Sequence, residues 1–202
     1  MTALLFVDFE ASSLEPGSYP IEAGWCDERG HGEAHLIHPP RHWQTWSAAA
    51  EAVHRITREQ LQAEGEPVRE VARRAAEALA TGRATVLSDC PPADQAWLDR
   101  LLAAGGVAAR PLLLDLWQVI RDAGMRVLRD AGAPMAMVPD VIRDIEEFAA
   151  RARAGHPPVH RALPDAQANA AMWRLAMKRT ADIATLWRSA IARQPEHPEG
   201  ER

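Results

Sequence analysis

Apolar and polar positions alternate through the first forty residues in the period of β-strands. Residues 3 to 9 predict a first strand, Ile21 to Cys26 a second and Glu33 to His38 a third. The turn at residues 27–32 joins the second and third strands closely, and two prolines stop the third. The chain therefore begins with an antiparallel meander of three strands.

The rest of the chain follows a helical period that two short strands interrupt. Apolar stripes predict helices over 48–54, 68–79 with Pro67 at its first turn, a helix that ends before Gly105, and helices over 116–131, 139–154 and from 164 onward. The strands are Ala84 to Leu87 and Pro111 to Asp115. This order predicts an α/β fold with a mixed five-stranded sheet, in which strands 1–3 are antiparallel, strands 4–5 are parallel, and helices flank the sheet.

Length and composition favour one domain. With 202 residues, of which 47% are hydrophobic, the chain can bury one substantial core. We expect a single domain over residues 1–193 and a disordered polar tail over 194–202, which holds two prolines.

Charge and cysteine content limit the class of protein further. The net charge of −5 disfavours a broad basic coat for nucleic acid, although metal ions can reverse the local field of an acidic site. The chain has two cysteines, opens without the features of a signal peptide, and has no apolar run of membrane-spanning length. We therefore expect a soluble, reduced, cytoplasmic protein that contacts no membrane.

Two acids close the first predicted strand. Asp8 and Glu10 stand one residue apart, so their side chains share one face of that strand. Two carboxylates on a buried strand are costly unless a cation or a proton relieves them. A divalent metal is the usual relief, but many acid pairs arise by chance and the pair alone is a weak signal.

Two further acids occupy the starts of predicted helices, and a histidine lies in the loop before one of them. Asp94 precedes Trp97 and Leu98 and so faces the sheet, while Asp165 lies in the first turn of a late helix, five residues after His160. Simple alternatives exist for each of them. An aspartate in a first turn stabilises the helix N-terminus without any catalytic role, and a histidine in a loop is commonly just exposed.

Taken together and in order, these residues resemble the DEDDh family of 3′-to-5′ exonucleases, the group of the DNA polymerase proofreading subunit. Five segments carry the resemblance: Asp8 to Leu14, Ile21 to Gly24, His54 to Thr57, Asp94 with Trp97 and Leu98, and His160 to Ala166. They run collinearly over most of the chain. The sister family has a tyrosine four residues before the last aspartate, where this chain has Arg161, so His160 indicates the histidine type.

The resemblance implies an RNase H-like fold and a two-metal exonuclease. Such an enzyme uses two Mg²⁺ or Mn²⁺ ions to release nucleoside monophosphates from the 3′ end of single-stranded DNA or RNA. The carboxylates suit these hard cations, and the absence of a Cys/His cluster argues against zinc. By resemblance, the metal ligands are Asp8, Glu10, Asp94 and Asp165, the general base is His160, and the substrate contacts are Ala11, Ser12, Leu14 and His54.

The chain departs from the family pattern where the substrate should bind. Ser88-Asp89 replaces the usual His-Asn, which makes Asp89 a competing acid, Ala11 replaces a residue that often contacts the terminal nucleotide, and Arg55 replaces a glycine. Further candidates for phosphate contact or base stacking are Arg55, Arg58, Arg161, Lys178, Trp43 and Trp46. The arginines and the lysine are more often simply solvated, and packing at the edge of the fold explains the tryptophans equally well.

Two other hypotheses stay open at this stage. The chain is alternatively a non-catalytic nucleic-acid-binding or protein-interaction module on the same fold, although all five catalytic positions are filled. A phosphodiesterase of small nucleotides is the third hypothesis. The helical last third also offers a surface for a homodimer.

Overall fold

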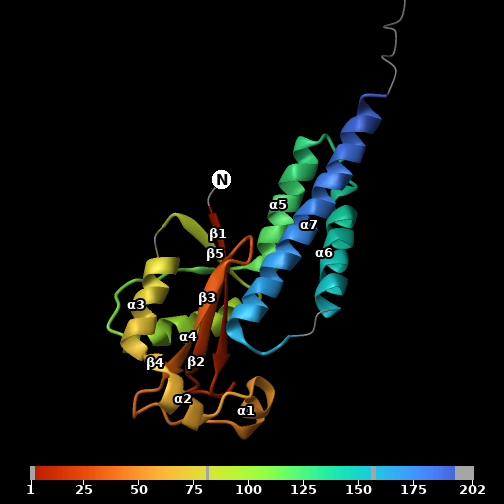
Figure 1. The fold of residues 1–202 in the computed structure, drawn as a ribbon. Coiled ribbons are helices and arrows are strands. Elements are labelled where there is room, and N and C mark those ends of the chain that lie inside the picture. Colours follow the sequence, from red (N-terminus) through yellow and green to blue (C-terminus); the bar gives the residue numbers. More distant parts are fainter. Residues whose placement is uncertain (1–2, 81, 156–157, 194–202) are drawn as a thin grey trace, which may run out of the picture.

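Figure 1 shows the computed structural model of the chain, which describes residues 3–80, 82–155 and 158–193. One sheet of six strands has the order β4-β3-β2-β1-β5-β6. The strands are β1 (Ala3–Ala11), β2 (Pro20–Asp27), β3 (Gly32–His38), β4 (Glu66–Pro67), β5 (Ala84–Ser88) and β6 (Leu113–Asp115). β1, β2 and β3 pair antiparallel, whereas β5 pairs parallel with β1, and β6 with β5. The predicted α/β fold with a mixed sheet is confirmed.

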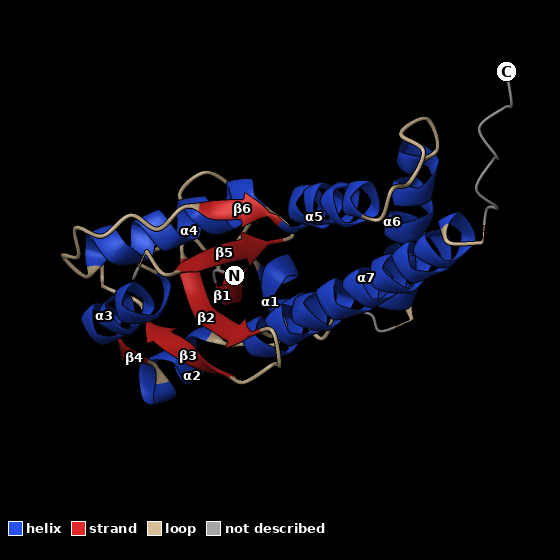
Figure 2. Cartoon of the chain, turned by 90° about the horizontal axis from the view of Figure 1, so that it is seen from above, coloured by secondary structure: helices blue, strands red, loops and turns tan. Residues whose placement is uncertain are grey.

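Helices surround this sheet and fill most of the second half of the chain. They are α1 (Ala48–His54), α2 (Arg58–Glu64), α3 (Val68–Leu79), α4 (Pro91–Ala104), α5 (Leu116–Asp130), α6 (Val138–Ala154) and α7 (Ala162–Ile191). Figure 2 shows α3 and α4 on the side opposite to the group formed by α5, α6 and α7. Within the described residues, no helix is both long enough and apolar enough to cross a membrane.

Two apolar cores lie on the two faces of the sheet, and β1 contributes to both. Val7 and Phe9 pack into the core shared with α3 and α4, whereas Phe6 packs into the core shared with α5, α6 and α7. Because side chains alternate along a strand, Asp8 and Glu10 lie on the same face as Phe6, the face that α7 covers. The predicted placement of this acid pair on one face of a central strand is confirmed.

The structure differs from the predicted elements mainly at one edge of the sheet. A sixth strand, β4, pairs with β3, so Pro67 belongs to this strand and precedes α3 instead of opening its first turn. Helix α2 was not predicted; the Thr57 hydroxyl starts it by accepting the Gln60 N–H at 3.1 Å. The strand predicted from Pro111 is shorter and begins at Leu113.

Two predictions on organisation remain untested. The single domain over residues 1–193 stays a prediction, and the tail 194–202 lies outside the described residues.

Cys26 and Cys90 are both free, Cys26 being buried and Cys90 exposed. No disulfide therefore joins these two cysteines.

Candidate active site

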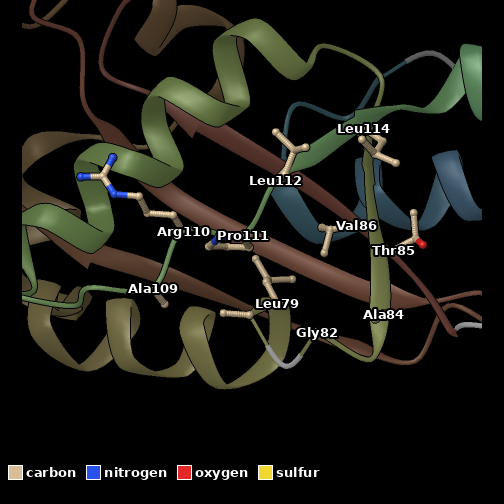
Figure 3. Close-up of a pocket in the computed structure, with 11 residues that line it drawn as sticks. Leu79, Gly82, Ala84, Thr85, Val86, Ala109, Arg110, Pro111, Leu112 and Leu114 are labelled. Atoms are coloured by element: carbon tan, nitrogen blue, oxygen red, sulfur yellow. The ribbon is translucent and has the colours of Figure 1, made fainter.

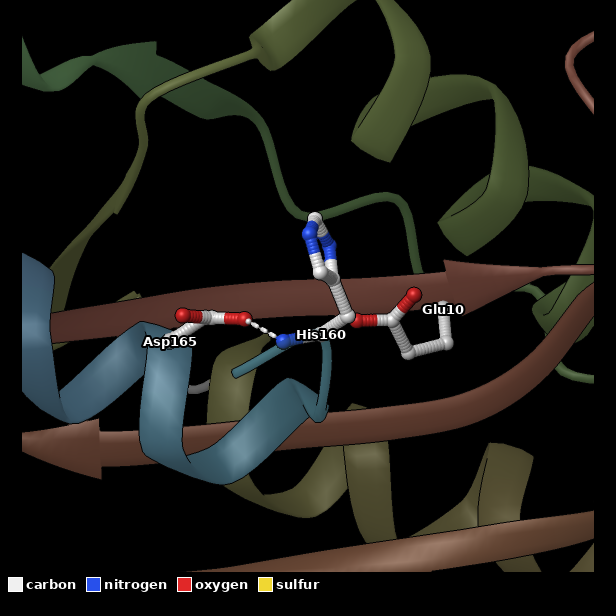
Figure 4. A group of neighbouring side chains, drawn as sticks. All are labelled: Glu10, His160 and Asp165. Atoms are coloured by element: carbon white, nitrogen blue, oxygen red, sulfur yellow. Dashed lines mark hydrogen bonds between the residues drawn. The ribbon is translucent and has the colours of Figure 1, made fainter. Parts of the chain in front are cut away.

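The first cluster of possible metal ligands joins β1 to the start of α7. One ligand atom each of Glu10, His160 and Asp165 lies within 4.8 Å of the others. Figure 4 shows the three side chains, with the main-chain N–H of His160 donating to Asp165 Oδ2 at 2.9 Å. Glu10 comes 150 positions before His160, and Asp165 comes five positions after it. The fold therefore brings distant parts of the chain to one place. The structure brings together three of the five residues predicted to be catalytic.

A second cluster lies between β1 and the start of α4. Ligand atoms of Asp8, Asp89 and Asp94 also lie within 4.8 Å of one another. Asp94 is 2% exposed and accepts a short hydrogen bond from the Ser88 hydroxyl, which in turn accepts the Cys90 N–H at 2.9 Å. Asp89, the competing acid of the sequence, therefore joins Asp94 instead of displacing it.

The two clusters are electrostatically connected. Burial raises the pKa of Asp8 well above its ordinary value, and the neighbouring charges of Asp94, Asp89, Glu10 and Asp165 raise it further. Burial first, and then the charge of Asp165, raises the pKa of Glu10 to about 7. These directions show that the acids crowd one another in a partly dehydrated place.

The pKa of Asp94 follows the same direction. Burial raises it to about 7, although the hydrogen bond from Ser88 opposes the rise. Carboxylate oxygens with one imidazole are the donor set that hard divalent cations such as Mg²⁺ and Mn²⁺ accept. The donors present therefore fit a divalent metal, whose charge would offset that of the acids.

Asp165 also holds the loop that carries His160. Its carboxylate accepts the main-chain N–H groups of Val159, His160 and Arg161 at 3.3, 2.9 and 3.3 Å, and Arg153 Nη2 at 3.3 Å. Helix α7 begins at Ala162, two residues before its predicted start, so Asp165 lies in its first turn as expected. The Asp165 carboxylate can therefore accept the main-chain N–H groups before α7 and also bind a metal ion.

The predicted substrate-contacting residues differ in accessibility. Ser12 is fully buried, its N–H donates to the Tyr19 carbonyl at 2.9 Å, and its hydroxyl accepts the Tyr19 N–H at 3.2 Å. Ala11 is 7% exposed, whereas Leu14 is 89% exposed. A groove of about 430 Å³ lies between Leu14 and α4, where Trp97 and Arg100 line it. Leu14 is therefore the one of these three whose side chain is exposed to solvent.

His54 is the last residue of α1 and lies close to the main chain of Ala11. It is 4% exposed, and burial lowers its pKa. Its Nδ1 accepts the Ile56 N–H at 3.0 Å, so the neutral ring carries its proton on Nε2. Nε2 itself is buried and has no hydrogen-bond partner among the described residues.

Most of the suggested phosphate or stacking residues bond within the protein. Arg58 Nη2 donates to the Tyr19 hydroxyl and the Trp43 carbonyl at 3.3 and 3.2 Å, Arg161 pairs with Glu22, and Lys178 pairs with Asp182 at 2.6 Å. Trp43 is 3% exposed and stacks on Tyr19, so it packs the fold. Trp46 is half-buried and meets His54 edge-on.

A second large pocket lies away from the acids. Figure 3 shows this hollow of about 430 Å³ between the end of α3 and the strands β5 and β6. Its lining is largely apolar and includes Leu79, Val86, Leu112 and Leu114. Because it contains no member of either acidic cluster, its size does not make it the catalytic site.

Sequence reasoning gave Glu22 only as part of a motif and left the role of Asp89 open. Glu22 is 2% exposed and binds Arg161, which is 139 positions further along the chain. For Glu22 the sequence did hold a signal of a structural role, namely an acid within a mostly apolar predicted strand. Asp89 has no such signal, because an acid after a strand is ordinary in a loop.

Comparison with solved structures identifies the fold. The chain is similar to E. coli exonuclease I in complex with a dT13 oligonucleotide, with a TM-score of 0.65 and 19% identity over 92% of this chain and 43% of that one. A zinc-bound E. coli exonuclease I–ssDNA complex gives a TM-score of 0.64 and 19% identity, over 91% and 42% of the two chains. No protein-family model matches the chain. No curated protein matches its sequence significantly.

The comparison covers nearly all of this chain but less than half of the other. The chain spans about two fifths of the length of the exonuclease I chains that it matches. At an identity of 19% the likeness establishes the architecture alone. The fold is therefore that of exonuclease I, an RNase H-like α/β fold with a mixed sheet flanked by helices.

Proposed function

We propose that this chain is a metal-dependent 3′-to-5′ exonuclease of the DEDDh type, which removes nucleoside monophosphates from the ends of single-stranded nucleic acid. The observation that carries the proposal is the convergence of two acidic clusters from β1, α4 and α7 on the fold of exonuclease I. Phosphodiester hydrolysis needs several carboxylates from different elements at one place. These clusters supply them.

Four acids would hold the metal ions. Asp8, Glu10, Asp94 and Asp165 are the ligands that we propose for two Mg²⁺ or Mn²⁺ ions, and Asp89 joins Asp8 and Asp94 as a further oxygen donor. When bound, such ions activate a water molecule and stabilise the charge that develops on phosphate. The raised pKa values of Asp8, Glu10 and Asp94 support this assignment, since a cation would offset the crowding that raises them.

His160 is the general base in this proposal. It lies within 4.8 Å of Glu10 and Asp165 by their ligand atoms, and an imidazole titrates near neutral pH. Its main chain has a φ of 56°, which non-glycine residues adopt at a cost. The side chain accepts the proton of the attacking water and releases it to solvent.

In this proposal the 3′ end of the nucleic acid binds in the groove between Leu14 and α4. We propose that exposed Leu14, with the main chain around Ala11 and Ser12, contacts the terminal nucleotide, and that His54 lies near its sugar or phosphate. The exonuclease I structures that resemble this chain hold dT13 and dA16, which favours single-stranded DNA. A cytoplasmic location and a homodimer stay predictions.

An end-labelled oligonucleotide assay tests the function. Single strands of DNA and of RNA, labelled at either the 5′ or the 3′ end, are incubated with the protein in Mg²⁺, in Mn²⁺ and in EDTA. We expect a 5′-labelled strand to shorten one nucleotide at a time, only with metal. Asp8→Asn should be inactive. Asp27→Asn should cut as the parent does, because Asp27 ends β2 opposite Leu5 and belongs to neither cluster.

Three results would contradict the proposal. They are the absence of metal-dependent shortening, shortening from the 5′ end, and an Asp8→Asn variant as active as the parent. Binding of single strands without cleavage would favour the non-catalytic module. Hydrolysis of small nucleotide diesters alone would favour a phosphodiesterase.

A further inference from the structure

Glu22 is a buried carboxylate that belongs to neither acidic cluster. It lies on β2 directly opposite Glu10 of β1 and is 2% exposed. Its oxygens accept Arg161 Nε at 3.1 and 3.0 Å, and the main-chain N–H of Ala162 donates to Oε2 at 2.9 Å. All of these donors come from the two residues that follow His160.

The segment 159–162 is therefore held from two sides. Asp165 accepts the N–H groups of Val159, His160 and Arg161, and Glu22 accepts the next N–H and the Arg161 side chain. Four consecutive main-chain donors are satisfied by two carboxylates. This network is what fixes the segment, because His160 at φ 56° lies in a conformation that a histidine adopts only when its surroundings impose it.

Close packing brings the same segment against β2. A Cβ atom at Gly24 would lie 2.6 Å from the Ala162 carbonyl carbon and would also collide with the Leu163 nitrogen. Only glycine allows α7 to begin this near to the strand. Glu22 and Gly24, two residues apart on one face of β2, thus form a seat for the start of α7.

From these contacts we propose that Glu22 is a positioning residue for catalysis, which holds the His160 main chain through Arg161 and Ala162. This inference rests on the proposed function, because His160 is its general base. Glu22 itself contacts neither metal nor substrate in this role.

Stability alone is a poor explanation for the ion pair of Glu22 and Arg161. Glu22 is taken out of water in this pair while the Arg161 side chain stays 41% exposed, and apolar replacements of a buried charge and its partner are often as stable or more so. The bidentate contact instead fixes orientation, because the guanidinium plane matches the carboxylate in only a few geometries. A fixed Arg161 leaves its neighbour His160 little freedom.

Glu22→Gln is the variant that tests the inference. The change keeps the shape of the side chain but turns one acceptor oxygen into an NH₂ group that faces the donors of Arg161. Glu66→Gln is the control, since Glu66 is another acid of the sheet with a charged partner. It lies on the outermost strand β4 with a side chain that is 36% exposed, and its Oε1 pairs with His35 Nδ1 at 2.6 Å. His160→Gln and the double variant of Glu22 and His160 complete the set.

Kinetics on a 5′-labelled single strand give the first result. We expect Glu22→Gln to lower kcat by about 10- to 100-fold with KM unchanged, as supporting partners of catalytic groups typically do. We expect the double variant to be no slower than His160→Gln alone, because Glu22 acts through His160. An unchanged kcat, or a double variant slowed by the product of the two single effects, would overturn the inference.

Hydrogen exchange gives a result that does not depend on activity. The amides of residues 159–162 should exchange faster in Glu22→Gln than in the parent and in Glu66→Gln, because their segment has lost one of its two anchors. Unchanged exchange there would overturn the inference even in an active enzyme. A parent protein without metal-dependent cleavage would instead defeat the proposed function, while the exchange comparison would still decide whether Glu22 holds the segment.

Discussion

Replacing Asp94 with asparagine should stabilise the metal-free protein at alkaline pH. Asp94 is 2% exposed, and burial raises its pKa from the ordinary 3.8 to about 7. The folded protein therefore binds this proton more tightly than the unfolded chain does. As the pH rises from 3.8 to about 7, the unfolded chain loses the proton first, so the stability of the folded state falls through this window.

The size of the effect follows from that interval. An interval of about three pKa units is worth about 4 kcal/mol once the carboxyl is fully ionised. Asparagine is spared this cost, which already includes the hydrogen bond from Ser88, because that bond opposes the rise of the pKa to about 7. The gain at pH 8 is therefore about 4 kcal/mol, or about 8–16 °C in Tm for a chain of 202 residues.

At pH 5 the gain should be much smaller. The folded carboxyl is still protonated there, so only the proton that the unfolded chain has already lost counts, which is worth about 1.6 kcal/mol. Thermal unfolding in EDTA at pH 5 and pH 8 measures both values. The control is Asp99→Asn on the same helix, whose carboxylate lies outside both clusters and accepts Gln95 Nε2 at 3.1 Å.

The reasoning is refuted if Asp94→Asn is less stable than the parent at pH 8. It is also refuted if the difference in Tm does not grow between pH 5 and pH 8. Excess Mn²⁺ should stabilise the parent more than the variant, because a ligand of the folded state stabilises it in proportion to its affinity. Equal stabilisation would separate Asp94 from the metal site.

Three other substitutions give separate tests. Gly24→Ala should destabilise the protein by about 2–3 kcal/mol in urea, because its Cβ has no room beside α7, and a neutral result would contradict the close packing. Arg55→Gly should raise the free energy of unfolding by about 1 kcal/mol, since Arg55 ends α1 with a φ of 59°; a loss of stability would count against this strain. Asp89→Asn should weaken Mn²⁺ binding in a calorimetric titration with little change in Tm, because Asp89 is exposed, and unaltered affinity would remove it from the metal site.

Local patterns in the sequence predicted most of the fold. Alternation located the three antiparallel strands, and the helical stripe ending before Gly82 located α3. The short strand β4 was missed because Glu66-Pro67 has no strand pattern; its pairing with Ile37 and His38 of β3 creates it. Helix α2 was missed because it buries a single residue, Leu61, and so has no apolar stripe.

The candidate site shows the same limit. The shared face of Asp8 and Glu10 follows from strand geometry, so the sequence sufficed for it. Arg161 and Arg58 looked like phosphate contacts because their partners, Glu22 and Trp43, are remote or lie in an irregular segment. A side chain's partner across the fold cannot be inferred from its own neighbours, and those partners decide whether a cation is free for substrate.

Titration of the chain with Mn²⁺ tests most directly that the acids of the two clusters bind divalent cations. Calorimetry should show saturable binding to the parent and to Glu66→Gln, and much weaker binding to Asp8→Asn, because Asp8 is close to acids of both clusters. If the parent shows no saturable binding, or if Asp8→Asn binds Mn²⁺ as the parent does, the acids are not a metal site and the proposed function loses its basis.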